Sequence, residues 1–151
     1  MAEATTPEGI TADYDNLDVR EALLALQTTP DYERLASFLR SLREGLLVAD
    51  VTGTHKKKST RVRTIRSTKG QLLLPLFTSM HELRLAHPKA AAQEPKGAIM
   101  PSREALALVR TGPFVAVQLN AGSVAQVVLR RYIDLVLSEQ TIDAQALEAQ
   151  R

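Results

Sequence analysis

The chain has 151 residues and a net charge of +2; 44% of the residues are hydrophobic and 24% are charged, as in an ordinary globular protein with one core. It contains no cysteine, which excludes disulfides, thiolate metal sites and cysteine nucleophiles. No apolar run approaches the roughly 20 residues that cross a bilayer, and the first residues do not resemble a secretory signal, so we expect a soluble, cytoplasmic protein without a membrane partner.

The N-terminal residues predict a tail and then a helix. Residues 1–15 are small, polar and acidic, so we expect a mobile tail. Asn16 is a good N-cap, and the helix that it begins should run over residues 17–26. The apolar stripe of this helix, which should face the core, consists of Leu17, Leu23, Leu24, Ala25 and Leu26.

A second helix is predicted over residues 31–43. Its apolar residues recur three and four positions apart, which is the helical period. Gly45 is placed to end it. The arginines of this segment are assigned to the outer face: Arg34, Arg40 and Arg43.

Three strands are expected next. Residues 46–51 form a short apolar run, and residues 61–66 and 71–77 flank a turn at residues 67–70 that predicts a hairpin. The third strand carries apolar side chains on both faces, which predicts burial on both faces. Pro75 cannot donate a ladder hydrogen bond, so we expect a bulge or an open side at that position.

The third strand leads directly into another helix. Ser79 can accept a hydrogen bond from the exposed amides of the first turn, and Glu82 can reach back to the cap, which is the pattern of a capping box. The helix should end near Leu85, because His87 precedes a proline and such residues avoid helical conformation.

The rest of the chain alternates between short strands and helices. The expected elements are a brief strand at 98–100, a helix at 103–110, a strand at 114–119, a turn at 120–123, a strand at 126–129, a helix at 130–137 and a polar tail at 139–151. The order α-α-β-β-β-α-(β)-α-β-β-α lacks regular βαβ alternation. It therefore indicates an α+β fold, with a mixed sheet of about five strands and helices packed around it, over residues 16–138.

Two segments resemble motifs of a known family. Residues 71–79, Gln-Leu-Leu-Leu-Pro-Leu-Phe-Thr-Ser, are similar to the apolar–Pro–apolar–Phe–Thr–Ser motif of SseB-like (enhanced serine sensitivity) domains. Residues 117–123 resemble that family's second motif, an apolar strand that runs into Asn-Pro-Gly, except that Ala121 replaces the proline. The resemblance spans about residues 16–137. It implies a bacterial cytoplasmic α+β domain of the N-terminal type, with no agreed catalytic residues.

The two motifs also supply the first candidate site, a polar binding rim. Thr78 and Ser79 begin a helix, where free amides can hold an anion, and Asn120 and Gly122 follow a strand at a position where open sheets often bind ligands. If the two strands are neighbours, these residues and Ser123 would surround a small pocket. Capping by Ser79 and turn formation at Asn120 explain the same residues without a ligand, and we favour that interpretation.

The second candidate is a basic hairpin. Residues 51–110 carry twelve basic and three acidic side chains, whereas residues 1–50 carry four basic and ten acidic ones. The basic segment could attract nucleic acid or another anion, but it has no interleaved aromatic residue and no glycine-rich phosphate loop. A solvated hairpin, protected from edge pairing by its charges, is the interpretation that we prefer. The candidate anion-binding residues are Lys56, Lys57, Lys58, Arg61, Arg63, Arg66 and Lys69.

No catalytic arrangement stands out in the sequence. The three histidines lack the spacing of a zinc helix, and neither a carboxylate pair nor a complete triad is evident. We therefore expect no enzymatic activity, no metal and no cofactor. The function that we predict is a non-enzymatic protein-binding or adaptor role, by a monomer or dimer, through a sheet edge or the rim near Thr78 and Asn120. Anion or nucleic-acid binding through residues 55–69 is the alternative.

Overall fold

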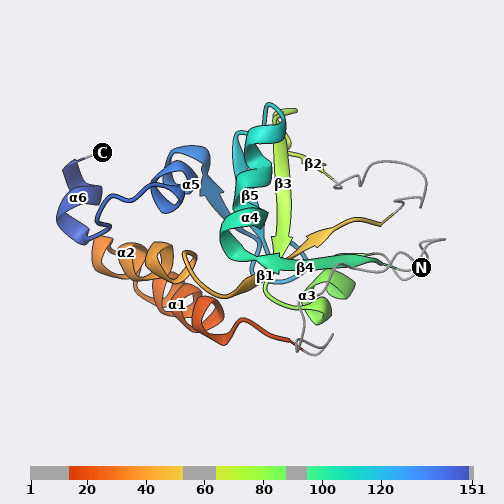
Figure 1. Ribbon diagram of the computed structural model, residues 1–151, viewed down its shortest axis with the longest axis horizontal. Helices are drawn as coiled ribbons and strands as arrows, with labels where there is room; N and C mark the ends of the chain where they lie inside the picture. The colour runs from red at the N-terminus through yellow and green to blue at the C-terminus, as the bar shows by residue number, and fades with distance from the viewer. Residues whose placement is uncertain (1–13, 53–63, 88–94, 150–151) are drawn as a thin grey trace.

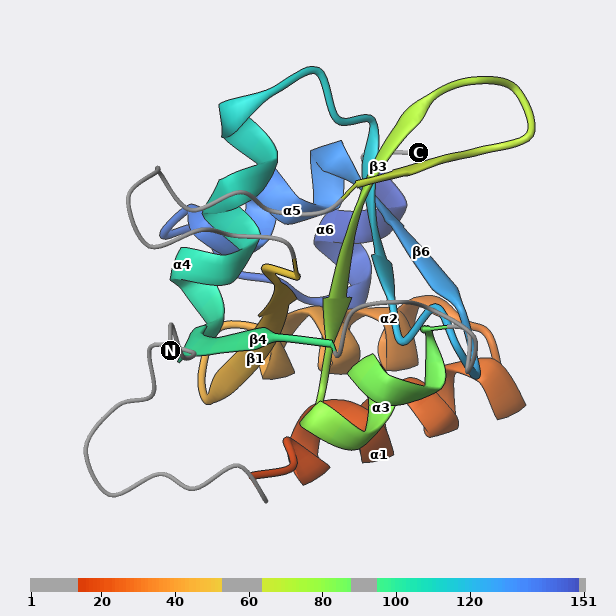
Figure 2. The same cartoon turned by 90° about the vertical axis from the view of Figure 1, so that its right-hand side faces the viewer.

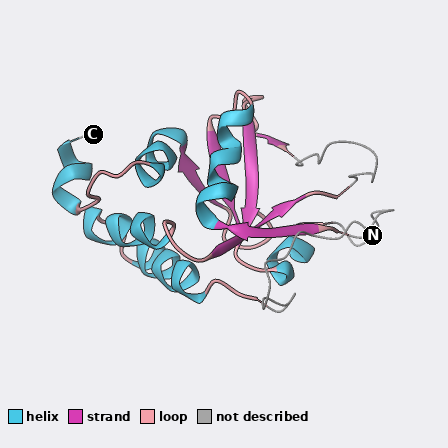
Figure 3. Ribbon diagram, viewed as in Figure 1, coloured by secondary structure: helices cyan, strands magenta, loops and turns pink. Residues whose placement is uncertain are grey.

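A mixed β-sheet with helices on both faces organises the chain (Figures 1 and 3). The computed structural model describes residues 14–52, 64–87 and 95–149, and within them the sheet has six strands. The strands are β1 (Leu46–Asp50), β2 (Ile65–Arg66), β3 (Leu72–Phe77), β4 (Gly97–Pro101), β5 (Ala116–Leu119) and β6 (Gln126–Leu129). The helices are α1 (Leu17–Thr28), α2 (Tyr32–Ser41), α3 (Met80–Leu85), α4 (Ser102–Ala107), the 3-10 turn η1 (Leu108–Thr111), α5 (Arg130–Leu137) and α6 (Ala144–Ala149).

The strand order β4-β1-β3-β5-β6 places β3 in the middle of the sheet. β3 is antiparallel to β1 and to β2, and it is parallel to β5. The expected α+β class, the mixed sheet and the hairpin between β2 and β3 are therefore confirmed. Residues 61–63 of the second predicted strand lie outside the described residues.

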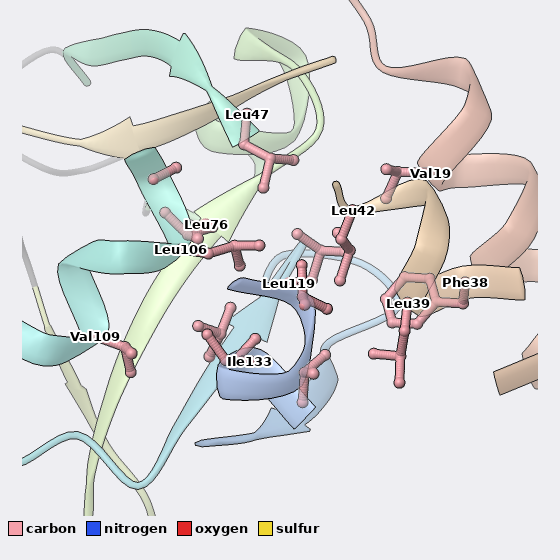
Figure 4. Close-up of a cluster of buried hydrophobic side chains, with 14 of the residues drawn as sticks. Val19, Phe38, Leu39, Leu42, Leu47, Leu76, Leu106, Val109, Leu119 and Ile133 are labelled. Carbon is pink, nitrogen blue, oxygen red and sulfur yellow. The ribbon is translucent and has the colours of Figure 1, made fainter. Parts of the chain in front are cut away.

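The central strand is buried on both faces, as its composition predicts. Leu74 and Leu76 are fully buried in the main core, while Phe77 belongs to a smaller cluster on the other face. The main core lies between the sheet and α1, α2, α4, α5 and α6, and Figure 4 shows its leucine-rich centre. The smaller cluster lies under α3, which Figure 2 shows in front of the sheet with α1 and α2 behind it.

Pro75 occupies an open side of β3 rather than a bulge. The amide of Val115 donates to the carbonyl of Leu72 (3.0 Å), and the amide of Asn120 donates to the carbonyl of Leu76 (2.9 Å), so these two residues face β5. Because main-chain groups alternate along a strand, Pro75 faces the opposite edge. There its position falls between the pairing of β3 with β2 and the pairing of β3 with β1. The missing amide therefore removes no ladder hydrogen bond.

The helix caps predicted from the sequence are present. Asn16 accepts a hydrogen bond from the amide of Val19, and Ser79 accepts one from the amide of Glu82 at 3.2 Å. α1 extends two residues beyond its predicted end, and α2 lies within its predicted bounds. The inward stripe of α1 was assigned partly wrongly: Leu17 and Leu24 are exposed, and Val19 takes a core position instead.

Two residues that were predicted to belong to the N-terminal tail, Tyr14 and Asp15, make contacts with the folded domain. The amide of Leu46 donates to the hydroxyl of Tyr14 (3.0 Å), and Asp15 forms a β-bridge with Ser79. Both residues are thus part of the fold, because β1 and the end of β3 provide partners that the sequence does not show. The preceding residues, 1–13, lie outside the described part of the chain.

The C-terminal segment is not the polar tail that the sequence predicts. Ile142 and Leu147 are buried in the main core, and α6 packs against α2. Two arginines of the α2 region bond to the main chain of this segment. The guanidinium of Arg43 lies within hydrogen-bond distance of four carbonyl oxygens, and Arg40 donates to the carbonyl of Ile142. Arg34 and Arg40 are both exposed, as predicted, and Arg34 pairs with Asp31, whereas Arg43 is only partly exposed.

Candidate functional site

The parallel pairing of β3 with β5 brings the two halves of the polar rim together. Thr78 and Asn120 follow these strands at the same end of the sheet. The amide of Thr78 donates to Oδ1 of Asn120 (3.0 Å), and Nδ2 of Asn120 donates to Oγ1 of Thr78 (3.1 Å). Thr78 is 0% exposed and Asn120 is 3% exposed. Their polar groups are therefore used to join the two strands.

Asn120 also suits the backbone at its position. Its φ of 55° lies in the left-handed region, which asparagine tolerates better than most residues. Its carbonyl accepts hydrogen bonds from the amides of Ser123 and Ala125, which closes the turn between β5 and β6. The asparagine of the second motif is thus explained by turn geometry and by its bonds to Thr78.

The remaining rim residues tie this turn to α3. Ser79 is 6% exposed and its hydroxyl caps α3. The hydroxyl of Ser123 donates to the carboxylate of Glu82 (2.7 Å). The carboxylate of Glu82 therefore bonds to the β5–β6 turn, where the capping box predicted a bond back to the cap. The rim residues are in contact through these bonds, as hypothesised, but they stabilise the fold.

Gly122 is required by close packing. A Cβ atom at this position would lie 2.5 Å from the carbonyl carbon of Leu85 and 2.6 Å from the amide nitrogen of Ala86. Both atoms belong to the backbone at the end of α3, so neither can move aside alone. The glycine of the second motif therefore allows the β5–β6 turn to lie directly against α3.

We expect Gly122→Ala to lower the free energy of unfolding by about 2 kcal/mol, because the added methyl forces the turn away from α3. Gly112→Ala is the matched control. Its Cβ would meet the ring of Phe114 at 3.2 Å, and a side chain can adjust more easily than a backbone. Urea unfolding of both variants measures the difference. Equal losses at the two positions would show that contact between the turn and α3 is not what selects glycine.

A hollow of about 410 Å³ lies beside the rim, between α1 and the β5–β6 turn. Most of its apolar lining comes from Leu17, Leu23, Leu24 and Val124. Of the rim residues, Asn120 and Ser123 line it, whereas Thr78, Ser79 and Gly122 do not. Apolar side chains of α1 thus make up much of the wall of this space, and ligand binding by the polar rim stays a prediction.

The sequence was also compared with protein-family models. The model of the SseB protein N-terminal domain matches residues 19–132, which run from α1 into α5. This chain belongs to the SseB family. Neither the curated proteins nor the solved structures gave a significant match. Both motifs discussed above lie inside the matched range, and in this SseB domain they form the joined ends of β3 and β5.

Most of the basic hairpin falls outside the described residues of the SseB domain. This applies to Lys56, Lys57, Lys58, Arg61 and Arg63. Arg66 donates to the carbonyl of Gly70 (2.8 Å) and so stabilises the turn between β2 and β3, while Lys69 is exposed in that turn. The two described members therefore show the hairpin geometry that the sequence predicts, and anion binding by the whole set stays a prediction.

One buried polar pair was missed by the sequence reasoning. Nε2 of His87 lies 2.8 Å from Oδ2 of Asp50, and the two side chains are only 7% and 6% exposed. The other carboxylate oxygen of Asp50 accepts from the amide of Thr52. The pair connects His87, two residues beyond the end of α3, to the end of β1. Only the fold brings these distant positions together, although an aspartate at the end of an apolar strand was a possible signal.

Within the described ranges, no helix has the length and apolar character needed to cross a membrane. The same residues contain no group of three or more His, Asp or Glu side chains arranged to hold a metal ion.

A second missed feature is a set of exposed apolar side chains. In the described part of the chain, the large hydrophobic residues with the greatest exposure include Leu24 (65%) and Leu17 (56%) on α1. Leu85 of α3 is next at 49%; near α1, Val124 is exposed in the β5–β6 turn, and Val127 and Leu129 are exposed on β6. The five residues of α1, this turn and β6 are considered together: Leu17, Leu24, Val124, Val127 and Leu129. We call these five residues the apolar surface. The helical pattern of α1 contains too many leucines for one inward stripe, and that excess was the available signal.

Proposed function

We propose that this SseB domain is a non-enzymatic protein-binding module that contacts its partner through the apolar surface. The observation that carries the proposal is the exposure of five large apolar side chains on three neighbouring features: α1, the β5–β6 turn and β6. Single exposed apolar residues are common on monomers, whereas a concentration of them is typical of interaction sites.

The neighbouring hollows support the same interpretation. The hollow lined by Leu17, Leu24 and Val124 lies on one side of α1, and a second hollow of about 330 Å³ lies between the end of α1 and β6. A contact between Nε2 of Gln27 and Oε1 of Gln126 joins α1 to β6 between them. A partner could therefore insert apolar side chains at two places on one continuous region, as the buried anchors of protein interfaces do.

The polar residues of the rim support protein binding rather than small-molecule chemistry. Thr78 and Asn120 satisfy each other, and Ser123 is bonded to Glu82. A catalytic or ligand-orienting group needs a polar atom that points into the available space. In the described part of the rim, the polar atoms are instead used to position the turn that presents Val124.

The double variant Leu24→Glu with Val124→Glu tests this proposal. We expect it to reduce the amount of captured partner by at least about tenfold, because each charge would be buried against apolar atoms of the partner. Affinity capture with quantitative mass spectrometry on the tagged full chain gives the measurement.

Val115→Glu is the control, since Val115 is also exposed (37%) but lies before β5, at the strand end opposite the β5–β6 turn. Unfolding curves establish that all three proteins are folded. If the double variant captured the same proteins in the same amounts as the native chain, the apolar surface would not be the binding site. Capture of nothing above background by the native chain would also contradict the proposal.

A further inference from the structure

β6 forms one edge of the sheet and has unpaired main-chain groups along it. Within the described residues it pairs only with β5. The amide of Arg130 donates to the carbonyl of Val115 (3.1 Å), so the main-chain groups of Arg130 face β5. Because the N–H and C=O groups of successive residues point to opposite edges of a strand, those of Gln126 and Val128 also face β5. The amides of Val127 and Leu129 therefore point outward. A strand laid beside β6 would find these donors in the correct spacing.

The edge has no charged residue and no proline to oppose such pairing. Natural edge strands commonly carry lysine, proline or an inward-pointing charge, whereas β6 reads Gln-Val-Val-Leu and is uncharged. The one described side-chain contact to an outward main-chain group of this strand is a bond from Nε2 of Gln126 to the carbonyl of Val127, at 2.9 Å. The glutamine side chain is uncharged, so the main chain of an added strand could replace it at the carbonyl of Val127.

A groove accompanies the edge on the helix side of the sheet. It is the hollow of about 330 Å³, and its walls away from β6 include Leu26, Pro30, Leu35 and Tyr132. None of the residues that line it is charged. Side chains alternate between the two faces of a strand. An added strand would therefore direct one set of side chains into this groove and the other set beside Val127 and Leu129.

We infer that β6 accepts an extended segment of a partner protein as an additional β-strand, with apolar side chains at alternate positions. This inference rests on the proposed function and specifies how the partner binds, which is the mode known as β-strand addition. The positive charge of Arg131 predicts the residue type at one end of the partner's segment. Arg131 stacks over the ring of Tyr132 (4.9 Å) and donates to its hydroxyl, and no described carboxylate pairs with it. The segment should therefore carry an acidic residue at the end beside Arg131.

A second copy of this chain fits the edge less well than a single extended segment. Pairing two β6 strands antiparallel requires a two-fold axis perpendicular to the sheet, which places both helix layers on the same face. The end of α1 and Pro30, which flank β6, would then meet their own counterparts over a strand of only four residues. A single extended chain brings no helices with it.

The test uses random ten-residue peptides displayed on phage and selected against the full chain. We expect enriched sequences with apolar residues at alternate positions and an acidic residue at one end. Synthetic versions should protect the amides of Val127 and Leu129 from hydrogen exchange in the native protein.

Val127→Pro removes the outward donor while leaving the bonds to β5 intact, so it should weaken peptide binding by about tenfold or more. Val127→Ile keeps the donor and should change binding by less than about threefold.

Three results would overturn the inference. Enriched peptides that bind Val127→Pro as well as the native chain, without protecting the two amides, would show that the edge is not used. A concentration-dependent dimer in sedimentation that Val127→Pro abolishes would show that the edge accepts a second copy. The absence of enriched alternating sequences would also reject strand addition. In each case the capture experiment with Leu24→Glu and Val124→Glu decides separately whether the apolar surface binds protein.

Discussion

Replacing Asn120 with alanine is expected to lower the free energy of unfolding by about 3–4 kcal/mol. Part of this loss comes from the amide of Thr78, which would remain buried without its acceptor, at about 1–3 kcal/mol. A further contribution of roughly 1 kcal/mol comes from placing alanine at a φ of 55°. The loss of the bond from Nδ2 to Oγ1 of Thr78 adds to both. Urea unfolding monitored by far-ultraviolet circular dichroism provides the measurement.

Two further variants separate these contributions. Asn120→Gly removes the same side-chain bonds but tolerates the left-handed backbone, so it should be less destabilising than Asn120→Ala by about 1 kcal/mol. Thr78→Val removes the hydroxyl and retains the amide bond to position 120, so its loss should be near 1 kcal/mol. A loss below about 1 kcal/mol for Asn120→Ala would mean that the joined ends of β3 and β5 contribute little to stability.

Local chemistry explains why much of the fold could be predicted from the sequence. β3 was predictable because its apolar residues fill both faces over a length that suits a strand, and the turn before it contains Gly70 at a positive φ. The caps at Asn16 and Ser79 were predictable because the hydroxyl or amide side chain and the first-turn amides lie within three residues of each other. These signals are contained in short segments, and they do not depend on tertiary contacts.

The parts that were missed depend on contacts between distant residues. Arg43 reaches carbonyls more than ninety positions away, and His87 meets Asp50 across thirty-seven. The buried side of residues 139–149 depends on two apolar residues, Ile142 and Leu147, in a polar sequence. Such a sparse pattern cannot distinguish a docked segment from a solvated one until the facing surface is known.

The sequence predicted part of the position of the polar rim, but it did not predict what its side chains do. The parallel arrangement of β3 and β5 does bring Thr78 and Asn120 together, as the two motifs suggested conditionally. Whether polar groups face a ligand or each other depends on how the two strands pair and end, which residue types do not reveal. The exposed leucines of α1 were likewise present in the sequence, but their helical spacing alone is compatible with either the core or a partner.

Arg43 should be the most sensitive of the charged residues of the α2 region. Its Nε and Nη2 atoms lie 2.6–3.0 Å from the carbonyl oxygens of Leu135, Val136, Ser138 and Gln140. These carbonyls end α5 and begin the segment that leads to α6, and a cation at a helix C-terminus also opposes the negative end of the helix dipole. We expect Arg43→Ala to lower the free energy of unfolding by about 2–3 kcal/mol, since charged donors contribute more than neutral ones. Arg43→Lys should recover less than half of this loss, because an ammonium cannot span four acceptors.

Arg34→Ala, within α2, is the matched control. Arg34 is exposed and pairs with Asp31, whose capping bond goes to the backbone amide of position 34 and survives the substitution. An exposed pair of this kind contributes at most about 1 kcal/mol. Hydrogen exchange adds a regional measurement: Arg43→Ala should increase exchange in residues 135–149 more than in β3, because the guanidinium holds that segment against α2. Uniform loss of protection throughout the chain, or equal unfolding energies for the two alanine variants, would show that Arg43 does not act as the link between α2 and the C-terminal segment.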